Sequence, residues 1–270
     1  MKRKWLSVSI VSLILLCISF YKTYLETSSV IETSSSIHTT QSNTETFEVK
    51  ETPYITERVE ASYPTIIGGV SQKKLDKWNQ IIKDDFDKIL AIYSYDPFAG
   101  LDEIPDQANR IYLRIQYEIK LLNKQFLSIL YRASYNSPYA AHPTELVYTT
   151  NIDTEKDRRL TLRDLVRLDS SFVSHLRSWE ISEIAPINPM LNAVIRTILN
   201  DISDEELLDG LNTADQIGSS NRWGIFTYLT PSKLGVSVSV PHFAGDHVEL
   251  EKAYEELKDY LNPDYQWDNP

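Results

Sequence analysis

The chain has 270 residues, of which 42% are hydrophobic and 24% are charged, and its formal net charge is −11. Beyond residue 24 there are 23 basic and 38 acidic side chains, a net charge of −15 that disfavours binding to the phosphate backbone of DNA or RNA. The single cysteine, Cys17, excludes an internal disulfide framework and a cysteine-rich zinc site. Neither the G-x-x-x-x-G-K-[ST] nor the G-x-G-x-x-G pattern occurs, so a nucleotide-binding enzyme has no sequence support and we expect no cofactor.

The N-terminus predicts the compartment. Lys2, Arg3 and Lys4 precede the uncharged run Trp5–Tyr21, which is long enough to serve as a signal or a short membrane anchor. Because cations before such a run stay in the cytoplasm, we expect residues 1–24 to form a membrane anchor with residues 22–270 outside. Two alternatives stay open: a signal cleaved after Cys17-Ile-Ser19, which gives a secreted protein, and a lipoprotein attached at Cys17.

A second segment, residues 25–50, has the composition of a stalk. From Thr27 to Glu45, eleven of nineteen residues are Ser or Thr, with no glycine and no aromatic residue. Such a sequence buries too little apolar surface to offset the entropy of ordering, so we expect it to be solvated.

Residues 51–153 predict a first α+β half. After an extended pattern at Thr52–Pro64, interpreted as ending in a turn at Ser62-Tyr63-Pro64, Ser71 offers a helix cap. The helical face that follows consists of Leu75, Trp78, Ile82, Phe86, Ile89 and Tyr93. The period then changes to two, which predicts an antiparallel meander of strands at Ile111–Leu121, at 127–133 and at Leu146–Ile152.

Residues 154–262 predict a second α+β half, followed by a tail at 263–270. Its predicted elements are a capped helix at Leu162–Leu168, a helix after Asn188-Pro189, a helix after the capping box Ser203–Glu206, strands at Ile225–Leu229 and 236–240, and a closing amphipathic helix at Leu250–Leu261. The expected fold is therefore α+β, with helices packed on antiparallel sheets in two sequential halves.

Several short motifs in this order resemble one exported bacterial family. They are Ala141-His142-Pro143, Asn151-Ile152-Asp153, Leu160–Leu165, Tyr228-Leu229-Thr230, Leu234-Gly235-Val236, Val240–Gly245 and Tyr254–Leu257. The family is the RsiV-like ectodomain, named after the lysozyme-sensing anti-sigma factor V and related to a region beside the catalytic domain of some peptidoglycan deacetylases. The resemblance covers residues 52–261 and implies a membrane-attached, extracytoplasmic binding module without catalysis.

The chain departs from this family in three respects. Only Met1–Lys4 precede the membrane run, so we expect no sigma-factor partner. No H-x-x-x-H spacing occurs, so deacetylase activity does not carry over. Where the family has Gly-Gly-Ala-His, this chain has Tyr139-Ala140-Ala141-His142, which removes the flexibility of the two glycines.

Two loops carry the candidate binding residues, Tyr139, His142, His242, Phe243 and His247. Aromatic side chains provide large contact areas at low entropic cost, which suits a protein or glycan ligand. If the loops converge, the three histidines and Asp246 are suitable zinc ligands, but their spacing matches no known metal motif and we expect no metal.

The sequence does not support catalysis. No G-x-S-x-G occurs, and a triad of Ser219 or Ser220 with His175 or Asp215 has no sequence context to align it. The main hypothesis is therefore a non-enzymatic binding domain for a cationic protein such as lysozyme or for a cell-wall glycan. The alternatives are an envelope hydrolase with an unrecognised active site and a structural envelope protein.

Overall fold

The computed structural model describes residues 47–100, 111–137, 140, 142–182, 189–218 and 223–267. The chain divides into two compact units, Met1–His38 and Thr39–Pro270, and all described residues belong to the second. The predicted anchor Trp5–Tyr21 and most of the predicted stalk lie outside the described residues. Within the described ranges, no helix is both long enough and apolar enough to cross a membrane.

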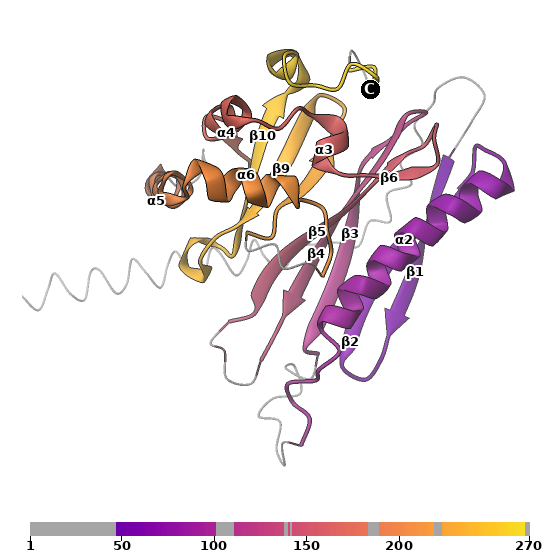
Figure 1. Cartoon of the computed structure of the whole chain (residues 1–270). Coiled ribbons are helices and arrows are strands. Elements are labelled where there is room, and N and C mark those ends of the chain that lie inside the picture. Colours follow the sequence, from indigo (N-terminus) through magenta and orange to yellow (C-terminus); the bar gives the residue numbers. More distant parts are fainter. Residues whose placement is uncertain are drawn as a thin grey trace, which may run out of the picture. The chain divides into compact units, whose positions relative to one another are not determined.

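The first sheet contains six strands that follow one another in chain order. They are β1 (Phe47–Ile55), β2 (Val59–Gly68), β3 (Leu113–Leu122), β4 (Phe126–Tyr135), β5 (Thr144–Asp153) and β6 (Arg158–Leu160). Neighbours pair in antiparallel fashion except β2 and β3, which are parallel over a short stretch because helix α2 (Gln72–Ile92) connects them. Figure 1 shows α2 lying along the sheet beside β1 and β2.

The predicted turn at Ser62-Tyr63-Pro64 is wrong, because these residues lie inside β2. Pro64 is opposite Glu51 of β1, and β2 pairs with β3 only through Val59–Ala61. At Pro64, the edge of β2 that faces away from β1 has no neighbouring strand. The missing N–H of proline therefore breaks no hydrogen bond of the sheet. Two residues further on, the side chain of Asn79 from α2 makes the hydrogen bonds that a neighbouring strand would make. Its amide accepts the N–H of Ile66 at 2.8 Å and donates to the carbonyl of Ile66 at 2.9 Å.

The predicted first helix is confirmed as α2, with its apolar stripe buried on the sheet. Ser71 is its N-cap residue, although the hydroxyl makes no capping bond, and Tyr93 is its C-cap residue. Trp78 is 1% exposed, and its indole N–H donates to Asp157 of the β5–β6 turn at 2.9 Å. The ring of Phe47 packs against Trp78 with centroids 6.0 Å apart, so the strand already begins within the segment assigned to the stalk.

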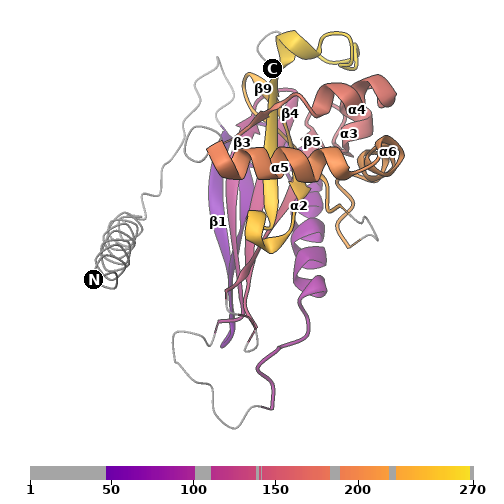
Figure 2. The same ribbon diagram turned by 90° about the vertical axis from the view of Figure 1, so that its left-hand side faces the viewer.

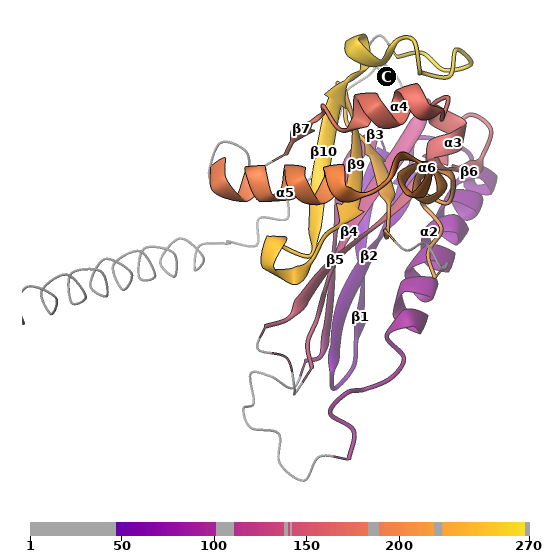
Figure 3. The ribbon, with the colours of Figure 1, turned by 60° about the vertical axis from the view of Figure 1, so that its left-hand side comes forward.

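The second sheet has four strands in the order β7 (Glu180–Ile181), β10 (His247–Ala253), β9 (Lys233–Ser239) and β8 (Phe226–Leu229). The helices of this half are α3 (Leu162–Leu165), α4 (Ser170–Leu176), α5 (Pro189–Asp201) and α6 (Asp204–Asn212). Figures 2 and 3 show α5 crossing β9 and β10, where Ile195 and Leu199 belong to the same buried cluster as Val236 and Val238. Helix α3 is shorter than predicted, and α4 was not predicted.

The predicted closing helix at Leu250–Leu261 is wrong. Residues His247–Ala253 form β10, which pairs with β9 along its whole length, and only Tyr254–Leu257 turn into a short 3-10 helix. Val248 and Leu250 are each 1% exposed and belong to the apolar core cluster, while Glu249 between them is buried with its charge paired to Arg132. The spacing of Leu250, Tyr254 and Leu257 favours a helix. Pairing with the free edge of β9 stabilises a strand instead, because tertiary contacts outweigh local propensity.

The two sheets contact each other through polar side chains. On the face of the first sheet away from α2, Ser128 donates to Asn151 at 2.7 Å and accepts the backbone N–H of Leu229 in β8 at 2.9 Å. Asn151 donates to the carbonyl of Thr227 at 2.7 Å, and both Ser128 and Asn151 are at most 1% exposed. These bonds and the extension of the first sheet by β6 join the two expected halves in one α+β unit.

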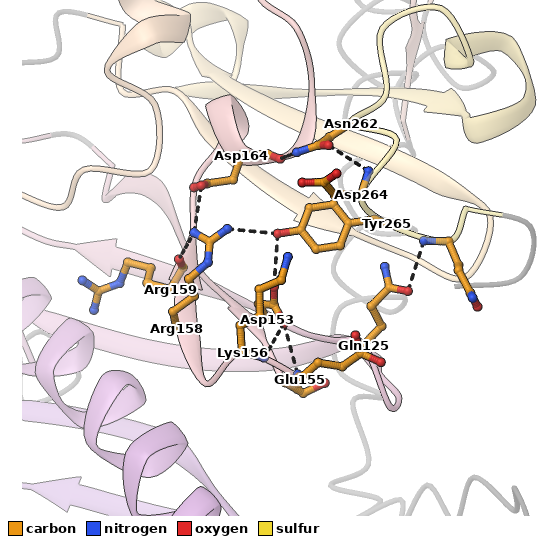
Figure 4. A network of polar contacts seen from close by, with 12 residues as sticks. Gln125, Asp153, Glu155, Lys156, Arg158, Arg159, Asp164, Asn262, Asp264 and Tyr265 are labelled. Carbon is orange, nitrogen blue, oxygen red and sulfur yellow. Dashed lines mark hydrogen bonds and ion pairs between the residues drawn. The ribbon is translucent and has the colours of Figure 1, made fainter.

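The C-terminal segment, predicted as a tail, packs into the fold. Tyr265 is 7% exposed and donates its hydroxyl hydrogen to Asp153 at 3.2 Å, while Arg158 donates to the same hydroxyl oxygen at 3.1 Å (Figure 4). Burial and the nearby Asp153 carboxylate raise the pKa of Tyr265 to about 12. Arg158 also pairs with Asp164, so this network connects the β5–β6 turn, α3 and the chain end.

Candidate functional site

Two loops that are about a hundred residues apart in the sequence meet at one surface. One connects β4 to β5 and carries His142; the other connects β9 to β10 and carries His242 in the 3-10 turn His242–Ala244. The two imidazole rings lie 6.1 Å apart between centroids, with an angle of 26° between their planes. The structure thus brings together two of the candidate residues, whereas Tyr139 lies outside the described residues.

An aspartate braces this meeting point. The Nδ1 atom of His242 lies 2.9 Å from one carboxylate oxygen of Asp246 and 3.0 Å from the other. Asp246 also accepts the backbone N–H of Glu145, at the start of β5, at 2.9 Å. Gly245 and Asp246 have φ angles of 103° and 68°, left-handed values that glycine and aspartate tolerate and that close the turn tightly. One carboxylate therefore holds both loops together.

The brace fixes the tautomer of His242. A carboxylate only accepts hydrogen bonds, so the Nδ1 atom beside Asp246 carries the hydrogen and, in the neutral ring, Nε2 keeps its lone pair. The side chain of His242 is 56% exposed, whereas that of Asp246 is 9% exposed. The arrangement presents an imidazole acceptor at the surface, backed by a largely buried carboxylate.

Phe243, the next residue, stands out from this surface. It is 73% exposed, although it lies in a short turn with buried Ala244 beneath it. Among the large apolar side chains of the described ranges, only Ile55, Tyr95 and Met190 are exposed to a similar or greater degree, at 72%, 73% and 80%. An aromatic side chain displayed on a braced turn has the form of a contact residue for a partner.

His247 does not join the other two histidines. Its side chain is 17% exposed, and its Nδ1 atom lies 3.9 Å from Glu249, whose carboxylate pairs with Arg132 of β4 at 2.7 Å. Burial lowers the pKa of His247, and the positive charge of Arg132 acts in the same direction against the opposing effect of Glu249. Its Nδ1 atom has no hydrogen-bond partner among the described residues. Because its side chain is largely buried beside Glu249, His247 is part of the interior and not of the loop surface.

The possible metal ligands of the described residues are not clustered. In the described part of the chain, no three side chains among His, Cys, Asp and Glu are grouped so that they could hold an ion. The rings of His142 and His242 lie near each other, and Asp246 contacts only the Nδ1 atom of His242.

The residues of the hypothetical triad have other partners. Asp215 accepts four hydrogen bonds, from the backbone of Leu162 and Thr227 and from the hydroxyls of Thr149 and Thr227. His175 accepts the indole N–H of Trp179 at 3.0 Å. Ser219 and Ser220 lie outside the described residues. Asp215 was missed as a structural residue because its four donors come from segments distant in sequence, which no local pattern indicates.

Two open clefts lie elsewhere on the unit. One, of about 410 Å³, is lined by Phe47, Val70, Ser71, Lys74, Trp78, Lys124 and Thr154. The other, of about 490 Å³, is lined by Tyr254, Lys258, Leu261, Pro263, Tyr265, Gln266 and Trp267. Neither of these two clefts is lined by a residue of the histidine loops.

Comparison with known proteins gives a likeness in fold alone. No family model matches the chain, and no curated protein is similar to it in sequence. A DUF3298 family member from Bacteroides fragilis is 14% identical, with a TM-score of 0.46 over 81% of this chain and 94% of that one. A DUF3298 family protein from Pseudomonas aeruginosa is 13% identical, with a TM-score of 0.43 over 82% of this chain and 96% of that one.

Proposed function

We propose that this protein is a membrane-attached, extracytoplasmic binding module without catalytic activity, and that its ligand is a cationic protein such as lysozyme. The observation that carries the proposal is Phe243, which is 73% exposed on a turn braced by the contact of His242 with Asp246. A rigid, exposed aromatic residue loses little entropy on binding and is typical of interface hot spots. The lysozyme part of the proposal comes from the RsiV-like motifs of the sequence.

The charge of the chain supports a cationic partner. A net charge of −15 beyond residue 24 attracts cations over long distances and accelerates their association at low salt. Contacts made by apolar and aromatic residues then determine how slowly the complex dissociates. The two contributions are separable in a kinetic experiment.

The experiment uses the unit Thr39–Pro270 and lysozyme as the probe, with association and dissociation followed by surface plasmon resonance. Phe243→Ala should raise the dissociation rate constant about tenfold, which corresponds to about 1.4 kcal/mol. Raising the ionic strength should mainly lower the association rate constant. The matched control is Tyr95→Ala, because Tyr95 is also 73% exposed but lies directly after α2, outside the histidine loops. Equal effects of both substitutions would contradict the proposed surface.

A cell-wall glycan is the other ligand to test. If lysozyme does not bind, sedimentation of the same unit with purified peptidoglycan decides between a glycan-binding module and a structural protein. A glycan-binding module should sediment together with peptidoglycan, and Phe243→Ala should abolish this. A structural protein without a glycan ligand should not sediment with peptidoglycan.

One observation favours a hydrolase as a second candidate. An imidazole whose Nδ1 is held by a carboxylate is the usual general base of a hydrolytic site. In the described ranges, however, the hydrogen bonds of His242 go to Asp246, and no hydroxyl is bonded to its ring. Release of soluble fragments from peptidoglycan by the wild type, but not by His242→Ala, would favour the hydrolase over the binding module.

The proposed location has its own test. With Trp5–Tyr21 as an uncleaved anchor, protease added to intact protoplasts should degrade the part beyond residue 22. Full protection would contradict the extracytoplasmic location. A mature chain that begins near Phe20 would instead indicate a secreted protein.

A further inference from the structure

We infer that His242 is the recognition point for a guanidinium group, so that the partner contacts this surface through an arginine side chain. This inference rests on the proposed function, because it specifies the chemistry of the same loop surface. Its starting point is the contact between Nδ1 of His242 and the carboxylate of Asp246, at 2.9 and 3.0 Å.

The geometry leaves one polar atom for a partner. Nδ1 donates to Asp246, so Nε2 of the neutral ring is the only acceptor of this side chain, and the side chain is 56% exposed. An acceptor at an interface requires a donor from the partner. The carboxylate behind the ring makes the imidazole more electron-rich and therefore a better acceptor.

The ring of His142 favours a flat donor group over a compact one. The ring of His142 is exposed and lies 6.1 Å from that of His242, at an angle of 26°. A flat guanidinium can lie against such a ring while one of its N–H groups points at Nε2 of the other. A lysine ammonium is compact and strongly hydrated, so it lacks the stacking contribution.

The charge around the two rings agrees with a cationic donor. Asp246 lies against His242, and the backbone of Glu145 is held by the same carboxylate. Arg132 of the adjoining strand β4 is paired with Glu249 at 2.7 Å. An incoming guanidinium therefore meets net negative charge as well as the acceptor.

The test compares two peptides that differ only in the cation. The full chain in detergent micelles is titrated with a labelled Gly-Arg-Gly-Arg-Gly peptide and with its lysine counterpart, and binding is followed by fluorescence anisotropy at pH 8. Both peptides have the same charge, so the nonspecific attraction to an acidic protein cancels. The arginine peptide should bind about fivefold more tightly, which corresponds to about 1 kcal/mol, because only a guanidinium can stack on one ring while it donates to the other.

Two variants locate the effect. His242→Ala should remove the preference for arginine, whereas His242→Gln, whose amide oxygen is a neutral acceptor, should retain part of it. His142→Gln, titrated with both peptides, separates the contributions of the two rings.

The inference is overturned if the two peptides bind equally well or if His242→Ala leaves the preference unchanged. These outcomes do not depend on lysozyme, so the inference can fail while the proposed function stands. Conversely, a preference for arginine that His242 controls would stand even if lysozyme proved to be the wrong partner. Thermal unfolding of each variant checks that the fold is intact.

Discussion

At the scale of single residues, the buried carboxylate of Asp215 connects segments of both sheets. Its carboxylate accepts bonds from Thr149 in β5, from the first residue of α3 and from Thr227 in β8, all in the interior. Its φ angle of 66° is one that aspartate tolerates better than most residues. Asp215 is thus the point at which three segments meet.

We predict that Asp215→Asn lowers the free energy of unfolding by about 2–4 kcal/mol. The amide has nearly the same shape, but its NH₂ group faces N–H and O–H donors and leaves them unpaired in the interior. Urea unfolding at pH 7 measures the change. The control is Asp209→Asn, whose side chain is exposed on α6, and it should change the stability by less than about 0.5 kcal/mol.

The same residue predicts a pH dependence. Burial raises the pKa of Asp215 to about 6, against the opposing effect of its four donors. Between pH 4 and pH 6 the folded protein therefore binds a proton that the unfolded chain has released, so the contribution of Asp215 to stability falls as the pH rises. The loss of stability caused by Asp215→Asn should shrink by about 1–2 kcal/mol between pH 4.5 and pH 7. A loss that grows with pH would mean that the four donors outweigh burial.

At the scale of elements, the sequence predicts a helix correctly where the spacing of its apolar residues and its cap residues indicate the same segment. Helix α2 has both a continuous apolar face and a cap residue, and α6 has its capping box in the structure as predicted. Two predictions were wrong where contacts with distant segments decide the structure: the helix predicted where β10 lies, and the turn predicted at Pro64. In each case the deciding group lies on another strand or helix, as Asn79 does for Ile66.

The candidate site follows the same division. The sequence predicts that both histidine loops carry aromatic and polar residues, and the structure brings His142 and His242 together. It cannot predict that Asp246 holds Glu145, or that His247, five residues after His242, faces the interior. The direction of a side chain at a strand end depends on the turn before it, here the left-handed Gly245 and Asp246.

We predict that Trp78→Ala lowers the free energy of unfolding by about 3–5 kcal/mol, because it empties the contact between α2 and the sheet. The substitution also removes the donor to Asp157 and the ring that Phe47 packs against. Thermal or urea unfolding monitors the change. A loss below about 1 kcal/mol would mean that α2 does not depend on this side chain for its packing.

At the scale of the whole unit, the start of β1 determines where the protein can be shortened. Phe47 packs on Trp78 and so closely over Gly69 that a Cβ added there would lie 2.5 Å from its ring. We predict that a fragment 51–270 is still folded but is less stable than 39–270 by about 1–3 kcal/mol, because it loses this aromatic ring and the first pairs of β1 with β2. Chemical unfolding of both fragments measures the difference. Equal stability would show that the fold begins after residue 50, as the composition alone suggests.

The polar contact between the two sheets also has a consequence for the order of folding. Each strand of the first sheet pairs with the next one in the chain, so all six strands are present once Leu160 has been synthesised. In the second sheet, Ile181 of β7 must find Leu250 of β10, near the end of the chain. Closing such a long loop is slow compared with forming hairpins. Until β8 is made, Ser128 and Asn151 can keep their hydrogen bonds with water, so polar groups interrupt the apolar surface that Leu130 and Val147 leave uncovered in the incomplete protein.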